Sequence, residues 1–155
     1  MSDELSHIMI VEARFYEDIS DELVRGAIAV LEGAGATYER VSVPGAFEIP
    51  AAISMALRSH EFYSGEKRFD GYIALGCVIR GETSHYKYIC QESAHALQVL
   101  AREYSLALGY GVLTVENSDQ AWERASTNKK NKGADAARAC LRMVDVKRHF
   151  HLDLR

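Results

Sequence analysis

The sequence predicts a three-layer α/β/α sandwich, in which helices cover both faces of a central parallel β-sheet. Segments with strand-like patterns alternate with segments of helical spacing along the 155 residues. Such alternation is typical of crossover units, which place successive strands in parallel. Residues 71–79 form a nearly unbroken apolar run, as expected for a strand buried on both faces of a parallel sheet. The length suits one domain, and we expect residues 1–155 to form it.

Two pairs of a strand and a helix are predicted in the first part of the chain. Residues 8–13 are a short apolar run, and the apolar positions that follow recur at helical spacing: Ile19, Leu23, Ala27, Ile28 and Leu31. Gly33 and Gly35 mark the end of this helix, because glycine adopts left-handed backbone geometry without penalty. Residues 37–43 alternate polar and apolar side chains like a strand, and a helix is predicted over residues 51–57.

The middle of the chain predicts a buried strand between a surface loop and a long helix. Residues 60–70 are polar and contain a glycine, which favours a loop before the apolar strand at residues 71–79. Residues 84–108 contain alanines but neither proline nor glycine, so they predict one continuous helix. A strand at residues 110–115 follows.

The last part of the chain predicts two helices. Asn117 or Ser118 can cap a helix that contains Arg124, and Gln120 is spaced from Asn117 as in a capping box. A lysine-rich turn separates this helix from a last one, which is predicted at residues 134–147.

Composition and charge exclude several classes of protein. The net charge of −4 would repel a phosphate backbone, so nucleic acid is not an expected partner. The apolar runs are far shorter than the roughly 20 residues that a membrane-spanning helix needs, and acidic residues near the start do not suit an export signal. Cys77, Cys90 and Cys140 are odd in number and form no C-x-x-C pair. We therefore expect neither a disulfide framework nor a zinc site, and a reducing cytoplasmic location.

Chemically versatile side chains follow the predicted strands at the sheet edge where parallel sheets bind ligands. Phe15 follows the first strand, residues 44–48 follow the second, and residues 80–85 follow the third. Phe47 and Glu48 combine an aromatic face with a carboxylate that can accept hydrogen bonds from a polyol or an amine. A buried phenylalanine and a solvated glutamate are an equally good interpretation of that segment alone.

The turn from residue 81 to residue 85 predicts an anion site beside a proton donor. The backbone N–H groups of Gly81, Glu82 and Thr83 precede a helix, whose dipole also favours a phosphate at this end. A simple turn with a helix cap is the alternative. His85 can both donate and accept a proton in neutral solution, which makes it the general acid/base candidate. A histidine at a helix start is, however, more often a cap or a surface group.

Basic side chains gather after the last predicted strand. Arg124 could hold a phosphate through its forked guanidinium group. Lys129, Lys130 and Lys132 accompany it, and the first two are interpreted as solvated surface.

Five blocks of sequence carry a resemblance to a known family. They are "ARF", "VPGAFEIP", "GCVIRGETSHYKY", "GVLTVENSDQAWERA" and "NKGADAA", and together they cover nearly the whole chain. Their order and spacing resemble the lumazine synthase family. The resemblance implies a flavodoxin-like fold and a transferase that uses no cofactor and no metal.

By this resemblance, the chain condenses 5-amino-6-ribitylamino-uracil with 3,4-dihydroxy-2-butanone 4-phosphate. The product is 6,7-dimethyl-8-ribityllumazine, and the reaction is the penultimate step of riboflavin biosynthesis. The alternative is a non-catalytic paralogue of the same fold that binds flavin or lumazine or serves as a scaffold. A flavodoxin-like electron carrier fits less well, because "ARFYED" offers no hydroxyl-rich phosphate loop.

The resemblance also implies a role for each matching residue. Phe15 would stack on the pyrimidine ring, and His85 would be the proton donor. The residues that would bind the ring and the ribityl chain are Ala46, Phe47, Glu48, Cys77, Val78, Ile79, Tyr110 and Lys132. The phosphate would be held by the N–H groups of Glu82 and Thr83 and by Arg124, with the Glu82 carboxylate pointing away.

The resemblance also implies that the chain forms a homo-oligomer. In the family the pocket lies between adjacent subunits of a pentameric ring, and Tyr110 and Arg124 would reach it from the neighbour. A single pentamer and multiples of pentamers, including hollow shells, stay open as alternatives.

Overall fold

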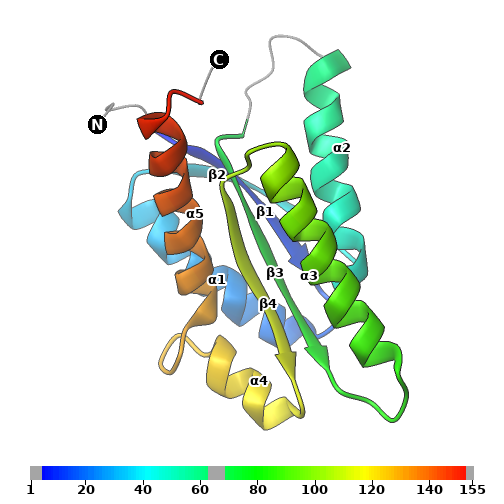
Figure 1. Cartoon of the computed structure of the whole chain (residues 1–155). Coiled ribbons are helices and arrows are strands. Elements are labelled where there is room, and N and C mark those ends of the chain that lie inside the picture. Colours follow the sequence, from blue (N-terminus) through cyan, green and yellow to red (C-terminus); the bar gives the residue numbers. More distant parts are fainter. Residues whose placement is uncertain (1–4, 63–68, 153–155) are drawn as a thin grey trace.

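Within residues 5–62 and 69–152, which a computed structural model describes, the fold is a four-stranded parallel sheet between two layers of helices (Figure 1). The strands, which lie in the order β2-β1-β3-β4, are β1 (His7–Ala13), β2 (Thr37–Val43), β3 (Gly71–Ile79) and β4 (Leu108–Val115). The helices are α1 (Glu17–Gly33), α2 (Ile49–Phe62), α3 (His85–Glu103), α4 (Ser118–Ala125) and α5 (Lys132–His149), with a short 3-10 turn, η1 (Ala46–Glu48), before α2. The predicted α/β/α sandwich is confirmed.

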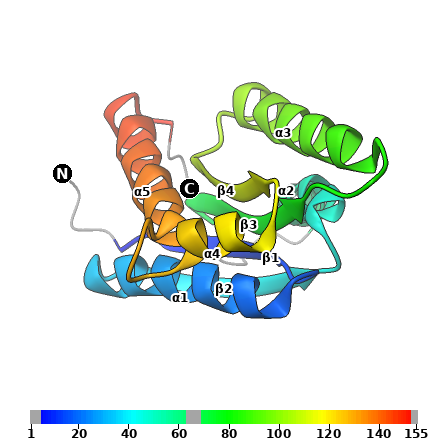
Figure 2. The ribbon, with the colours of Figure 1, turned by 90° about the horizontal axis from the view of Figure 1, so that it is seen from below.

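The side chains of the sheet alternate between two helical layers. Helices α1, α4 and α5 cover one face, and α2 and α3 cover the other (Figure 2). On β1, Ile8 and Ile10 belong to the core beneath the first layer, whereas Met9 and Val11 belong to the core beneath the second. This separation follows from the two-residue period of a strand.

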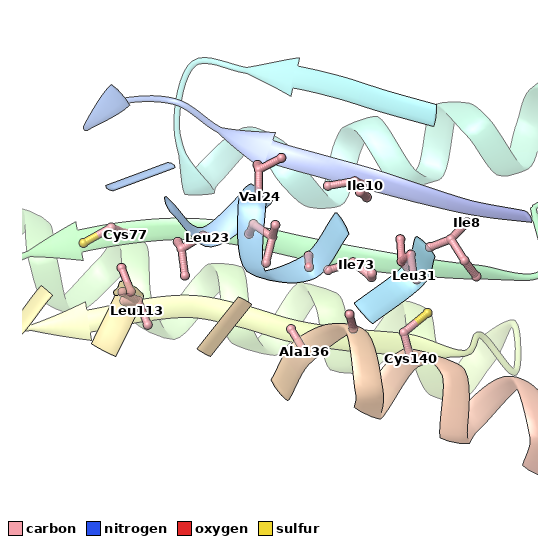
Figure 3. Packing of buried hydrophobic residues seen from close by; sticks show 14 of the residues in the cluster. Ile8, Ile10, Leu23, Val24, Leu31, Ile73, Cys77, Leu113, Ala136 and Cys140 are labelled. Atoms are coloured by element: carbon pink, nitrogen blue, oxygen red, sulfur yellow. The ribbon is translucent and has the colours of Figure 1, made fainter. Parts of the chain in front are cut away.

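The core under α1 and α5 is built from branched side chains of the strands and small side chains of α5. Figure 3 shows Leu23 and Leu31 of α1 spread along β3, which carries Ile73 and Cys77, while Ala136 and Cys140 come from α5. The small residues on α5 let this helix approach β4 closely.

Helix α3 ends earlier than the sequence predicts. The predicted helix over residues 84–108 was wrong at its C-terminus, because α3 ends at Glu103 and β4 already begins at Leu108. Ser105 has a φ of 52°, and the N–H of Leu106 donates to the carbonyl of Ala101 at 3.0 Å. A serine in left-handed geometry therefore breaks the helix without the glycine or proline that usually signals a break.

Helix α2 is longer than the sequence predicts. It runs over Ile49–Phe62, so residues 60–62, predicted as part of a loop, are helical. Residues 63–68 of that predicted loop lie outside the described residues. At the end of α1, Gly35 has the expected left-handed geometry with a φ of 72°, whereas Gly33 stays within the helix.

Helix α4 starts with the predicted cap. The Asn117 side chain accepts a hydrogen bond from the N–H of Gln120 at 2.9 Å, so Asn117 and not Ser118 is the cap residue. The Gln120 side chain accepts from the N–H of Glu116 at 2.9 Å, one residue before the position that a capping box uses. Among the helices of the described ranges, none has the length and apolar character needed to cross a membrane.

Candidate active site

A groove of about 640 Å³ lies at the carboxyl ends of β1, β2 and β3. It is formed by the connections that follow these strands and by the first turns of α3. Its lining residues are Phe15, Tyr16, Pro44, Gly45, Ala46, Phe47, Glu48, Cys77, Val78, Ile79, Gly81, Thr83, His85, Tyr86 and Ile89. The volume suits a small organic ligand, and the place is the one that parallel sheets use for binding.

Two exposed aromatic rings stand at the groove. Phe15, directly after β1, is 72% exposed, and Phe47, in η1, is 59% exposed. The Phe15 ring meets the ring of Tyr16 edge-on, with 4.9 Å between centroids. Large apolar rings that remain open to solvent at a concave site favour binding of a flat ring by stacking.

The Glu48 carboxylate is held at the groove by its own turn. Its Oε2 atom accepts a hydrogen bond from the N–H of Gly45 at 3.1 Å, and the N–H of Glu48 donates to the carbonyl of Gly45 at 3.1 Å. These reciprocal bonds fix the direction of the side chain. The remaining acceptor positions of the carboxylate are available to the hydroxyl or amine groups of a ligand.

The end of β3 supplies the floor of the groove through Cys77, Val78 and Ile79. Cys77 is buried, and burial raises the pKa of its thiol to about 12. The thiol therefore stays protonated in neutral solution and is unsuited to nucleophilic attack. Cys77 contributes shape and backbone groups to the floor.

The turn after β3 brings the predicted anion site and His85 to the same groove. Gly81, Thr83 and His85 all line it, and the hydroxyl oxygen of Thr83 accepts a hydrogen bond from the N–H of His85 at 3.3 Å. Glu82 does not line the groove. A helix N-terminus and His85 thus lie at one groove, an arrangement that can hold an anion and move a proton beside it.

Arg80 anchors this turn from outside the groove. Its backbone N–H donates to the carbonyl of Val115 at 2.9 Å, and its Nε atom donates to Glu116 at 2.7 Å. Its guanidinium also lies over the ring of Tyr86, 4.4 Å from the centroid. Arg80 therefore ties the start of α3 to the end of β4.

Besides Glu82, three more predicted site residues do not line the groove of their own chain, which makes four in all. Tyr110 on β4 is 43% exposed, and partial burial raises the pKa of its hydroxyl. Arg124 on α4 donates to the carbonyl of Gln120 at 3.2 Å, and Lys132 pairs with Asp135 at 3.3 Å. Within one chain, the groove therefore receives no guanidinium group from α4.

Tyr16, Tyr86 and Ile89 also line the groove, although they were not predicted as site residues. Tyr86 follows His85 directly, and Ile89 lies one helical turn beyond His85 on the same face of α3. The four-residue spacing from His85 to Ile89 was a usable signal, because residues with this spacing share a helix face.

The described parts of the chain, residues 5–62 and 69–152, contain no group of three or more His, Cys, Asp or Glu side chains placed to hold a metal ion. All three cysteines are free.

Comparison with known proteins assigns the chain to a family. A family model described as 6,7-dimethyl-8-ribityllumazine synthase matches residues 6–148. The chain is 55% identical over 144 residues to 6,7-dimethyl-8-ribityllumazine synthase 1 of Rhizobium meliloti (strain 1021), covering 93% of each chain. It is 53% identical over 142 residues to 6,7-dimethyl-8-ribityllumazine synthase of Agrobacterium fabrum (strain C58 / ATCC 33970), covering 92% of this chain and 95% of the relative. It is also 52% identical over 144 residues to 6,7-dimethyl-8-ribityllumazine synthase of Bartonella tribocorum (strain CIP 105476 / IBS 506), covering 93% and 91%. The chain therefore belongs to the 6,7-dimethyl-8-ribityllumazine synthase family.

Proposed function

We propose that the chain condenses 5-amino-6-ribitylamino-uracil with 3,4-dihydroxy-2-butanone 4-phosphate to form 6,7-dimethyl-8-ribityllumazine in the cytoplasm, as a step of riboflavin biosynthesis. The observation that carries this proposal is the groove that joins two exposed aromatic rings, a fixed carboxylate and a histidine at a helix start. Relatives that are more than half identical and that carry the name of this synthase support the same reaction.

The ring-bearing substrate occupies the β1 and β2 side of the groove. Phe15 stacks on the pyrimidine ring, and Ala46, Phe47 and Glu48 contact the ring and the ribityl chain. The ribityl hydroxyls can donate to the Glu48 carboxylate, whose direction is already fixed by Gly45. The floor made by Cys77, Val78 and Ile79 limits how deeply the ring enters.

The phosphate of the other substrate occupies the turn before α3. The N–H groups of Glu82 and Thr83 and the dipole of α3 favour an anion there. Glu82 as a whole does not line the groove, so the proposal requires its N–H to reach the phosphate from beside the groove while its carboxylate points away.

His85 supplies the proton transfers. The substrate amine attacks the ketone to give a carbinolamine, which loses water to become an imine. Phosphate is then eliminated, and the second amine closes the ring by attacking the remaining carbonyl, with loss of a second water. Each step moves a proton, and an imidazole beside the phosphate site can deliver and accept these protons.

A second copy of the chain completes the site. None of Tyr110, Arg124 and Lys132 lines the groove of its own chain. A bound phosphate nevertheless needs a cation beside it. Arg124 of a neighbour supplies that cation in a head-to-tail contact, which closes into a pentameric ring. Tyr110 of the neighbour forms the second aromatic wall, and Lys132 lies near it.

Mixing the purified protein with both substrates tests the function. The expected result is fluorescent lumazine together with an equal amount of free phosphate, both at rates well above those of the mixture without protein. A binding or scaffold paralogue would bind lumazine but release no phosphate, and that result would contradict the proposal.

A further inference from the structure

A buried carboxylate lies on β1, three positions before Phe15. Glu12 is 3% exposed and sits in a strand whose neighbouring side chains, Ile10 and Val11, are apolar and fully buried. Charged side chains are almost never buried unless they are paired. The hydrogen-bond partners of Glu12 therefore indicate the role of its charge in the structure.

Two arginines, one on β2 and one directly after β1, bind Glu12. Arg40 of β2 donates twice, from Nε to Oε2 at 2.8 Å and from Nη2 to Oε1 at 2.8 Å. Arg14 donates from Nη1 to Oε1 at 2.8 Å. Burial by itself would raise the pKa of the Glu12 carboxyl, but the hydrogen bonds and charges of Arg40 and Arg14 outweigh burial and lower it. The carboxylate therefore stays ionised and keeps both arginines.

Arg14 extends this cluster to the connection that carries Phe15. Its guanidinium also pairs with Asp21 of α1, and its backbone N–H donates to the carbonyl of Val43 at 3.1 Å. Ser20 of α1 donates from its hydroxyl to the carbonyl of Ala13 at 2.7 Å. The short segment between β1 and α1 is thus held from β1, from β2 and from α1.

The Phe15 side chain has little packing of its own that could hold it. It is 72% exposed, and its ring contact is the edge-on contact with Tyr16. The direction in which the ring points is therefore set by the backbone of residues 14–16. A buried ion pair adds little net stability compared with apolar residues, so its benefit at this place is fixed geometry.

We propose that Glu12 and Arg14 are positioning residues that hold Phe15 in the orientation needed to stack on the ring-bearing substrate. The proposal rests on the proposed function. The phosphate-bearing substrate is held on the other side of the groove, at the turn before α3, and that turn is anchored separately by Arg80. Loss of the Glu12 cluster should therefore weaken binding of the ring-bearing substrate and leave binding of the phosphate-bearing substrate unchanged.

Steady-state kinetics with each substrate varied in turn tests this selectivity. Glu12→Gln keeps the shape of the side chain and removes its charge, and Arg14→Met keeps the stem and removes the fork. Both variants should raise the KM for the ribitylamino-uracil by about tenfold or more, because small displacements of a positioning group have large effects. The KM for the butanone phosphate should not change. The Kd of the lumazine product, read from its own fluorescence, should rise with the first KM.

Two further variants separate positioning from general loss of structure. Arg14→Lys retains a charge that can reach one carboxylate, so its KM for the ring-bearing substrate should lie between those of wild type and Arg14→Met. Arg58 does not line the groove, and Arg58→Gln, which removes a contact between its guanidinium and the ring of Phe62 on α2, should change neither KM. An equal rise of both KM values in Glu12→Gln and Arg14→Met would overturn the positioning role.

Asp21→Asn tests the positioning role if Glu12→Gln and Arg14→Met do not fold. Asp21 is exposed and holds only the α1 end of Arg14, so the variant should fold and should raise the KM for the ring-bearing substrate alone by several-fold. An unchanged KM in a folded Asp21→Asn protein, with wild type fully active, would overturn the positioning role and leave the proposed function intact. A wild-type protein that forms no lumazine would overturn both.

Discussion

His85 is the residue whose chemistry distinguishes an enzyme from a binding protein at this groove. It lines the groove next to Thr83 at the start of α3, where a phosphate group is expected. A protein that only bound flavin would need the aromatic rings but no proton donor beside an anion site.

His85→Ala should slow the reaction without abolishing it. General acid/base catalysis contributes on the order of a hundredfold or more, whereas holding two substrates together can contribute far more and is retained. Single-turnover rates measured from lumazine fluorescence check this. His95→Ala is the matched control, because His95 is exposed on the same helix but does not line the groove, and its rate should equal wild type. An undiminished rate in His85→Ala would remove His85 from the mechanism.

Glu12 should make the stability of the protein depend on pH in the acid range. Burial alone would raise the pKa of the Glu12 carboxyl. The hydrogen bonds and charges of Arg40 and Arg14 outweigh burial, so the pKa in the folded chain is lowered from the ordinary value of 4.5. Its contribution is therefore fully present above about pH 4.5 and is lost as the pH falls through the lower folded pKa.

Glu12→Gln should consequently cost about 2 kcal/mol at pH 7, because Arg14 and Arg40 lose a charged acceptor, although their side chains are 23% and 46% exposed and keep access to water. The cost should shrink toward zero in acid, where the wild-type carboxyl is also neutral. Urea unfolding followed at several pH values measures both limits. A difference between variant and wild type that stays constant from pH 7 down to the acid limit would contradict the assigned ionisation.

At the scale of elements, the contact between β4 and α5 depends on a residue without a side chain. A Cβ atom at Gly109 would lie 2.0 Å from the carbonyl oxygen of Ala136, which is backbone and cannot rotate away. A Cβ atom at Gly33, near the end of α1, would meet nothing within 4 Å. The same substitution should therefore have opposite effects at the two places.

Gly109→Ala should lower the free energy of unfolding by about 2 kcal/mol or more, because α5 has to move away from the sheet. Gly33→Ala should raise it by about 0.5 kcal/mol, because alanine favours the helical conformation. Chemical denaturation of the two variants beside wild type measures this. A Gly109→Ala protein as stable as Gly33→Ala would show that the close approach is not needed.

The sequence was sufficient for the elements whose signals are local. The strands at residues 37–43 and 71–79 have the predicted bounds, because period-two alternation and an unbroken apolar run are strong patterns. The end of α3 was not predictable, because Ser105 carries no sign of left-handed geometry in its residue type. The length of α2 was missed because polar residues near its end resemble a loop.

The candidate site was predictable where its residues follow strands directly. Phe15, the segment at residues 46–48 and His85 all line the groove, since the carboxyl ends of parallel strands meet at one edge. Tyr86 was missed because its contribution depends on how α3 starts. The Glu12 cluster was missed too, because its partner Arg40 is distant in sequence and becomes a neighbour only through the pairing of β1 and β2.

At the scale of the whole molecule, one chain presents what we propose to be part of a catalytic site. The groove holds the rings, the carboxylate and the histidine, while Tyr110, Arg124 and Lys132 lie elsewhere on the surface of the same chain. A ring of copies joined head to tail would bring the second set of one chain to the groove of the next.

Co-expression of two impaired variants tests this shared site most directly. His85→Ala damages the groove, and Arg124→Ala damages the group that a neighbour is proposed to supply. If the two sets come from different chains, random mixing leaves about a quarter of the sites with neither defect, because each site draws one part from each of two chains. The expected result is lumazine formation at about a quarter of the wild-type rate per chain. A mixed protein no more active than the average of its two parents would contradict a site shared between chains.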